Sequence, residues 1–150
     1  MTNFTTMSDS TLLPELVFRS AERTPTASAL TYGKTTLDYA SLANAMRRFA
    51  GGLLSLGLSR GERVAIYLEK RFETVIASFG APVAGAVFVP INPLLKPEQV
   101  GYILRDCNVR ILVTSPERLA LIQGTLGECH DLRQIVMLDS DDAKPAIGSL

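Results

Sequence analysis

The chain has 150 residues, of which 47% are hydrophobic and 20% are charged, and this composition excludes disordered and collagen-like chains. Fifteen Lys and Arg balance fifteen Asp and Glu, so the net charge is zero and no nucleic-acid partner is expected. The two cysteines, Cys107 and Cys129, form no CxxC motif, which favours a reducing compartment, the cytoplasm.

The first part of the chain predicts a helix, a hairpin and a long helix. Residues 1–10 carry no secretory signal and are expected to be a disordered lead-in. Turn and capping residues set the expected boundaries of the elements that follow. These elements are a helix over 12–23 capped by Ser10 or Thr11, a hairpin of 29–32 and 35–37 turned at Gly33, and a helix from the cap Asp38 to Gly57, with Leu42, Met46, Phe49, Leu53 and Leu56 on its apolar face.

The second part predicts alternating strands and helices. Residues 63–68 form a near-continuous apolar run, which is typical of a strand covered on both faces in a parallel sheet. The order βαβαβαβ after the hairpin therefore predicts an α/β fold, a mostly parallel sheet with helices on both faces. The further strands are expected at 86–89, 109–113 and 134–138, and the helices at 71 to about Pro82, from Pro97, and at 116 to about 127.

The expected domain organisation is one partial α/β domain over residues 11–138. Residues 139–150 are polar and are predicted to form a loop at a truncated end. The uncharged stretch 74–95 is long enough to cross a bilayer. Pro82, Pro90 and Pro93 interrupt it, so we expect no transmembrane span.

Three local motifs each have a structural and a chemical interpretation. Residues 32–35, YGKT, resemble the end of a phosphate-binding loop, but Ser28 stands where that loop needs its first glycine, so a hairpin turn is preferred. Cys129 and His130 could form a nucleophile and base, yet adjacent side chains on a turn usually diverge. The acidic residues Asp139, Asp141 and Asp142 lack the glycine and glutamate of a calcium loop. We therefore assign no catalytic, cofactor-binding or metal-binding residue.

Three segments resemble a known family. They are LDYASL at 37–42, RGERVAI at 60–66 and AGAVFVPINP at 84–93, and together they resemble the opening of the AMP-forming adenylating enzymes. This family includes acyl-CoA synthetases, peptide-synthetase adenylation domains and luciferases. Residues 70–74 and 92–100 further resemble the acyl-CoA ligases associated with bacterial exosortase systems. The resemblance covers residues 12–138 and implies part of the large N-terminal domain of such an enzyme.

The chain departs from the family pattern at two places. Pro82 and Val83 stand where the family usually continues a helix, and Glu62 replaces the commoner aspartate. The resemblance places the family's phosphate loop, ribose-binding aspartate and catalytic lysine downstream of the matched region. ATP, Mg²⁺ and CoA are accordingly implied for the parent enzyme, and this chain alone is expected to bind none of them.

The expected function follows from the resemblance. The chain would be the N-terminal fragment of a ligase that converts a carboxylic acid, such as a fatty acid, to acyl-CoA through an acyl adenylate. The fragment alone would be inactive, its partner would be the remainder of the ligase, and its uncovered sheet edges would favour self-association. Two alternatives remain open: a complete non-catalytic α/β protein-interaction module, and a small enzyme that uses Cys129 and His130.

Overall fold

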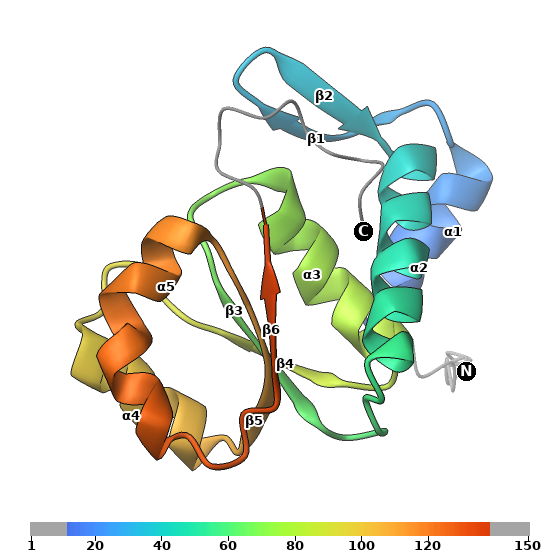
Figure 1. The fold of residues 1–150 in the computed structure, drawn as a ribbon. Coiled ribbons are helices and arrows are strands. Elements are labelled where there is room, and N and C mark those ends of the chain that lie inside the picture. Colours follow the sequence, from blue (N-terminus) through green and yellow to red (C-terminus); the bar gives the residue numbers. More distant parts are fainter. Residues whose placement is uncertain (1–11, 139–150) are drawn as a thin grey trace, which may run out of the picture.

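The structure, a computed structural model, describes residues 12–138 (Figure 1). The lead-in at 1–10, the capping residues Ser10 and Thr11, and the loop at 139–150 lie outside the described residues. The elements are α1 (Glu15–Arg23), β1 (Ser28–Tyr32), β2 (Thr35–Asp38), α2 (Tyr39–Ser55), β3 (Arg63–Tyr67), α3 (Phe72–Val83), β4 (Val87–Pro90), α4 (Pro97–Asp106), β5 (Val109–Thr114), α5 (Pro116–Ile122), the 3₁₀ helix η1 (Gln123–Glu128) and β6 (Gln134–Met137).

The predicted α/β architecture is confirmed. Strands β3 to β6 form a four-stranded sheet in the order β4-β3-β5-β6, in which every neighbouring pair is parallel. Helices α1, α2 and α3 lie on one side of this sheet, and α4 and α5 lie on the other (Figure 1). The antiparallel pair β1 and β2 forms a separate hairpin, and β6 points toward it (Figure 1).

Strand β3 shows why its sequence is apolar without alternation. Val64 and Ile66 pack in the core on the side of α2 and α3, whereas Ala65 and Tyr67 pack in the core on the side of α4. Successive side chains of a strand point to opposite faces, so both faces of β3 must be covered. Two hydrophobic cores therefore share one sheet.

The predicted turn and cap signals are confirmed at the hairpin and at α2. Gly33 adopts a positive φ of 59° between β1 and β2, a conformation that favours glycine. Asp38 caps α2, and its Oδ1 accepts a hydrogen bond from the N–H of Ser41 at 2.8 Å. Gly57, with φ 82°, follows the end of the helix. Of the predicted apolar face of α2, Leu56 is the exception, because it is 42% exposed.

Helix boundaries differ from the predictions at two other places. Helix α1 begins at Glu15 instead of residue 12, directly after Pro14. Helix α5 ends at Ile122 and continues as the 3₁₀ helix η1, a tighter turn that suits a short segment containing two glycines. The expected end of α3 near Pro82 is confirmed, since the helix ends at Val83.

The stretch 74–95 divides between a helix and a strand. Helix α3 occupies its first half and β4 lies in its second half. Among the helices of residues 12–138, none combines the length and the apolar character needed to cross a bilayer.

Candidate functional site

The carboxyl ends of β3 and β5 mark the position where a parallel sheet of this topology can form a binding crevice. Helix α3, which follows β3, packs with the core on the α2 side, and α5, which follows β5, packs with the opposite core. The two neighbouring strands thus send their connections to opposite faces of the sheet. Ligands of open α/β sheets bind at such a reversal, outside the carboxyl ends of the strands.

An ion pair spans this reversal. The guanidinium Nε of Arg118, in α5, donates a hydrogen bond to Oε1 of Glu69, which follows β3. A second guanidinium nitrogen of Arg118 donates to the carbonyl oxygen of Pro93 at 2.8 Å. The guanidinium carbon also lies 5.8 Å from the centre of the Tyr67 ring, within the range of a cation–π contact. Arg118 therefore links the segments that follow β3, β4 and β5.

Two buried hydroxyl groups fix the backbone next to this ion pair. Thr114 donates its hydroxyl to the carbonyl oxygen of Tyr67 at 2.9 Å, which joins the ends of β5 and β3. Ser115 caps α5, and its hydroxyl accepts from the N–H of Arg118 at 3.3 Å. Both residues are at most 1% exposed. The start of α5, and with it Arg118, is thereby fixed against the sheet.

The charge state of the ion pair follows from its surroundings. Burial raises the pKa of the Glu69 carboxyl, but hydrogen bonds from its own backbone N–H and from Arg118, with the charges of Arg118 and Arg71, outweigh burial and leave the pKa below its ordinary value. The hydrogen bond to Glu69 in turn raises the pKa of Arg118. Both groups are charged at neutral pH, so the crevice contains a closed ion pair instead of an uncompensated charge.

A hollow of about 430 Å³ lies beside the ion pair, between the carboxyl ends of β3 and β4. Its hydroxyl groups are engaged within the chain: Thr74 donates to the carbonyl oxygen of Glu69 and Ser78 to that of Thr74, both at 2.7 Å. Lys70 brings an exposed ammonium group to the rim. The lining is Ile66, Leu68, Glu69, Lys70, Thr74, Ser78, Pro90, Ile91, Asn92, Pro93 and Leu94. This hollow is predominantly apolar and contains no pairing of a nucleophile with a base.

The phosphate-loop-like segment 32–35 and the acidic residues after 138 are the next candidates from the sequence. Gly33 and Lys34 lie in the hairpin turn between two strands, whereas a phosphate-binding loop must open a helix. The preferred interpretation of residues 32–35 as a hairpin is therefore confirmed. The acidic residues Asp139, Asp141 and Asp142 lie outside the described residues.

Cys129 and His130 do not form a catalytic pair. Cys129 is 6% exposed and its thiol faces the carbonyl oxygens of Thr125, at 3.6 Å, and Gly101, at 4.0 Å. His130 is exposed. Burial raises the pKa of the Cys129 thiol, which lowers the fraction of reactive thiolate. The predicted divergence of the two adjacent side chains is confirmed, but the thiol belongs to the core instead of a surface turn.

Within residues 12–138, no group of three or more His, Cys, Asp or Glu side chains is placed to hold a metal ion. The pairing of Glu69 with Arg118 was not predicted from the sequence, because 49 positions separate the two residues. The nearest signal is the position of Glu69 directly after one predicted strand, 63–68, and of Thr114 directly after another, 109–113, since residues at that edge of a parallel sheet come together.

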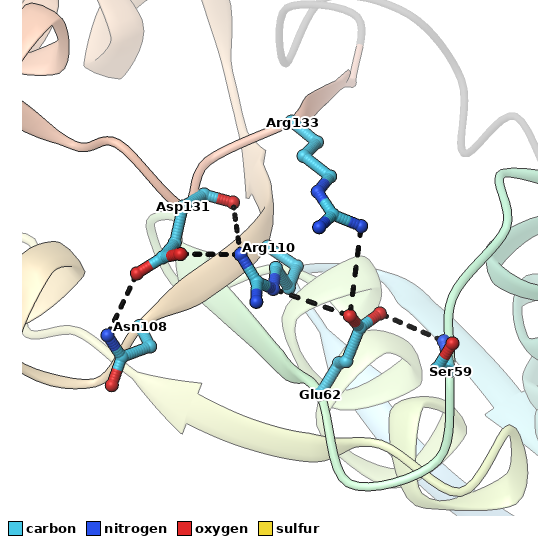
Figure 2. Close-up of polar contacts among 6 residues, drawn as sticks. All are labelled: Ser59, Glu62, Asn108, Arg110, Asp131 and Arg133. Atoms are coloured by element: carbon cyan, nitrogen blue, oxygen red, sulfur yellow. Dashed lines mark hydrogen bonds and ion pairs between the residues drawn. The ribbon is translucent and has the colours of Figure 1, made fainter.

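The amino ends of the strands hold a second polar cluster (Figure 2). Glu62, in the turn before β3, accepts a hydrogen bond from the N–H of Ser59 at 2.9 Å. Its other carboxylate oxygen lies 3.3 Å from Nε of Arg110 and 3.9 Å from a guanidinium nitrogen of Arg133. Arg110 also contacts the Asp131 carboxylate at 2.6 Å. The cluster ties together the segments that precede β3 and β6.

Asp131 is the second carboxylate of this cluster. Asn108 donates its side-chain amide to Asp131 at 2.8 Å, and this hydrogen bond, followed by the charge of Arg110, lowers the pKa of the Asp131 carboxyl. Each carboxylate of the cluster is thus matched by a guanidinium group. Because it lies at the amino edge, away from the reversal at the carboxyl ends, we assign the cluster a structural role.

The same edge brings two of the recognisable sequence segments into contact. The N–H of Gly61, from residues 60–66, donates to the carbonyl oxygen of Gly85, from residues 84–93, at 2.8 Å. The N–H of Val87 donates to the carbonyl oxygen of Glu62 at 2.9 Å. Gly61 and Gly85 both have φ of 80°, so each turn uses a conformation that favours glycine.

Comparison with known proteins places this fold among adenylating enzymes. A sequence model described as AMP-binding enzyme matches residues 17–149. One polypeptide of the linear gramicidin synthase of Brevibacillus parabrevis is 32% identical over 124 residues, which are 83% of this chain and 2% of that protein. A long-chain-fatty-acid–CoA ligase of Thermus thermophilus is 35% identical over 101 residues, which are 67% of this chain and 19% of that ligase.

Solved structures give the same result. The anthranilate CoA ligase AuaEII in complex with anthranoyl-AMP matches with a TM-score of 0.80 and 31% identity, over 84% of this chain and 24% of that chain. VinN, in a complex with 3-methylaspartate, matches with a TM-score of 0.74 and 30% identity, over 85% of this chain and 34% of that chain. This chain thus spans about a third or less of the length of each of these relatives.

Proposed function

Because this chain belongs to the AMP-binding enzyme family, we propose that it forms the N-terminal part of an AMP-forming ligase that activates a carboxylic acid. One observation carries the proposal. The match to the family runs over residues 17–149, through every strand of the parallel sheet, while the chain covers 24% of the anthranilate CoA ligase that it resembles at 31% identity. We infer from this partial coverage that the chain corresponds to one part of a longer enzyme.

The proposed reaction of the parent enzyme has two steps. The carboxylate of the acid attacks the α-phosphate of ATP, which gives an acyl adenylate and releases pyrophosphate. The thiol of CoA then attacks the acyl carbonyl, which gives acyl-CoA and releases AMP. We propose a fatty or related acid as substrate, CoA as acceptor, and the cytoplasm as compartment, supported by the likeness to the Thermus thermophilus long-chain-fatty-acid–CoA ligase.

The first step brings anions together, so it requires cationic and N–H donors where negative charge develops. The described residues do not fit a site for ATP and Mg²⁺. Lys34, the lysine of the YGKT segment, lies in a hairpin turn; at the carboxyl edge Arg118 is already paired with Glu69, and Lys70 is exposed at the rim of a predominantly apolar hollow. We therefore propose that this part supplies a scaffold on which the nucleotide and acyl pockets are built.

The proposal is tested first by the reading frame that encodes the chain. We expect it to continue past Leu150 into a Gly- and Ser-rich loop that ends in lysine. The longer polypeptide should catalyse acid-dependent exchange of pyrophosphate into ATP, and the 150-residue chain should give only background exchange. Exchange by the short chain above background would overturn the scaffold role.

A complete protein-interaction module is the second candidate, and the absence of an assigned catalytic residue within 12–138 is compatible with it. A stop codon after Leu150 together with a stably folded monomer would favour this candidate over the ligase. The third alternative, an enzyme that uses Cys129 and His130, has no support in the geometry, because the thiol is buried and the imidazole is exposed.

A further inference from the structure

The β3–β4 hollow, lined by residues of 66–70, α3 and 90–94, is built on bonded backbone. The N–H of Ile91 donates to the carbonyl oxygen of Ile66 at 2.9 Å, and both residues line the hollow. Thr74 and Ser78 line it from α3, one helical turn apart. The volume of about 430 Å³ lies within the range of about 300–1,000 Å³ that is usual for small-molecule pockets. The hollow is therefore large enough for a small ligand.

One rim of the hollow, residues 92–94, is held in place. Oδ1 of Asn92 accepts a hydrogen bond from the N–H of Leu94 at 2.9 Å. The guanidinium group of Arg118 donates to the carbonyl oxygen of Pro93 at 2.8 Å. Leu94 is 86% exposed, the largest exposed fraction of any large hydrophobic side chain among residues 12–138. This rim therefore presents apolar surface that a ligand in the hollow can cover.

The polar groups of the lining leave one charge unmatched. The hydroxyls of Thr74 and Ser78 donate to carbonyl oxygens of the same chain, both at 2.7 Å. The carboxylate of Glu69 is paired with Arg118. The ammonium group of Lys70 is exposed and forms no ion pair with any other residue of 12–138. The hollow thus offers an incoming molecule apolar walls and one free cation.

A larger hollow beside α1 differs in its charges. It has a volume of about 700 Å³ and is lined by residues of α1, β1, α2 and α3. Arg19, Glu22 and Arg23 contribute its charged groups. Arg19 is already paired with Glu15, and Arg23 is accompanied by Glu22, so these charges balance. The β3–β4 hollow is therefore the better match for a ligand that carries a single negative charge.

We propose that the β3–β4 hollow binds an aliphatic monocarboxylic acid, with the apolar body of the acid in the hollow and its carboxylate beside the Lys70 ammonium. Burial of the methylene groups supplies most of the affinity. The charge of Lys70 adds an attraction that a carboxylate gains and an alcohol of the same length does not. This inference rests on the proposed function, because it names a place for the acid of that reaction.

The test uses the 150-residue chain with sodium octanoate as the probe and 1-octanol as its uncharged analogue. Proton–nitrogen NMR spectra recorded during a titration with octanoate should show saturable shifts at the amides of Lys70, Thr74, Ser78 and Leu94. Added NaCl should weaken the binding of octanoate and leave that of 1-octanol unchanged, because salt screens an exposed charge pair. No saturable shift at these amides, or shifts spread evenly over the surface, would overturn the proposal.

A charge variant and its control locate the carboxylate. Lys70→Gln should raise the dissociation constant of octanoate about threefold or more, the scale of an exposed charge pair, and leave that of 1-octanol unchanged. Lys34→Gln removes an exposed lysine in the hairpin turn and should change neither constant. Octanoate binding that Lys70→Gln leaves unaltered would overturn the proposed placement of the carboxylate.

A filling variant and its control locate the apolar body. Ser78→Leu should raise the dissociation constants of both octanoate and 1-octanol about tenfold or more, because an occupied hollow excludes the ligand. Ser20→Leu is the control, since the Ser20 hydroxyl also donates to the carbonyl four residues earlier, Leu16, at 2.8 Å, and Ser20 lines the hollow beside α1. Binding that Ser20→Leu weakens and Ser78→Leu does not would place the acid in the other hollow and overturn the proposal.

Two further readouts keep this inference separate from the ligase function. The dispersion of the NMR spectra shows whether each variant is folded, and if Ser78→Leu is not, the exposed Lys70 variant decides. In the longer polypeptide, Ser78→Leu should raise the KM for the acid in pyrophosphate exchange and leave the KM for ATP unchanged. An unchanged KM for the acid would overturn the acid site and leave the ligase function standing. Octanoate binding by a longer polypeptide that catalyses no exchange would overturn the ligase function alone.

Discussion

Glu69 and Arg118, which are 49 positions apart in the sequence, form an ion pair at the point where β3 and β5 send their connections to opposite faces of the sheet. The pair occupies the position at which a sheet of this kind usually opens to a ligand. It is anchored by Thr114 and Ser115, whose hydroxyls are buried and bonded. This edge is therefore a closed, cross-linked part of the fold.

Replacement of Arg118 by methionine should destabilise the chain by about 1 kcal/mol. The variant removes the guanidinium donor from Glu69 and from the Pro93 carbonyl, but the Arg118 and Glu69 side chains are 21% and 32% exposed, so water compensates part of the loss. Urea unfolding at fixed protein concentration measures the change. Arg19→Met is the control, because the Arg19–Glu15 pair on α1 is exposed and its loss should cost less than about 0.5 kcal/mol. Equal effects of the two variants would contradict the structural role of Arg118.

Stability should fall in acid. Burial raises the pKa values of Glu69 and Glu73, but hydrogen bonds, including those from Arg118 and Arg71, leave both values lowered. A carboxyl whose pKa is lower in the folded state stabilises the fold fully above its unfolded pKa, near 4. That contribution is lost as the pH falls through the lower, folded value.

The pH dependence can be traced to these two groups. The free energy of unfolding, measured from pH 7 to pH 3, should be constant near neutrality and decline below about pH 4. The double variant Glu69→Gln, Glu73→Gln should start from a lower stability and lose less of it between pH 5 and pH 3. An unchanged acid decline in the double variant would show that other carboxylates dominate.

Two glycines of the helices should respond to alanine with opposite signs. A Cβ on Gly80 of α3 would lie 2.8 Å from Cδ1 of Phe49 and 3.2 Å from the carbonyl oxygen of Met46, both in α2. Gly80→Ala should therefore destabilise the chain by about 1–3 kcal/mol, as overpacked cores do. A Cβ on Gly51 of α2 meets nothing within 4 Å, so Gly51→Ala should stabilise by up to about 1 kcal/mol. Thermal unfolding of both variants measures the signs, and destabilisation by Gly51→Ala would contradict the open space around it.

Arg110 of β5 should contribute more to stability than Arg105, which lies in the last turn of α4. Arg110 contacts both Glu62 and Asp131 and its side chain is 26% exposed. Arg105 contacts Glu128, and these side chains are 38% and 74% exposed. Arg110→Met should cost about 1–2 kcal/mol and Arg105→Met less than about 0.5 kcal/mol. Chemical denaturation in low and high salt checks this order. A larger loss from Arg105→Met would reverse the assignment.

The sequence was sufficient to predict the elements whose signals are local. The near-continuous apolar run of β3, the cap Asp38 and the turn at Gly33 each report a nearby physical requirement, and all three are confirmed. The start of α1 and the end of α5 were displaced, because Pro14 and the glycines of η1 shift helix ends that periodicity alone does not locate.

The carboxyl-edge ion pair could not be predicted because it is a long-range contact. Nothing near Arg118 in the sequence identifies Glu69 as its partner; the two meet because β3 and β5 are neighbours in a strand order that skips β4. Glu62 departs from a family pattern, but its contacts with Arg110 and Arg133 become evident only in the tertiary structure. Local sequence patterns thus predicted the helices and strands, whereas the order of the strands in the sheet determined which side chains meet.

The hydrogen bond from Gly61 to Gly85 has a consequence for enzyme engineering. This bond joins two of the segments that resemble the family, 60–66 and 84–93, at the amino ends of β3 and β4. Relatives described as a gramicidin synthase and as a fatty-acid ligase both align with this chain. In this chain the contact fixes the turn before β3 against the turn before β4, and both glycines have φ of 80°, a conformation that favours glycine. Libraries of variants of this chain should therefore keep both glycines fixed and diversify other positions.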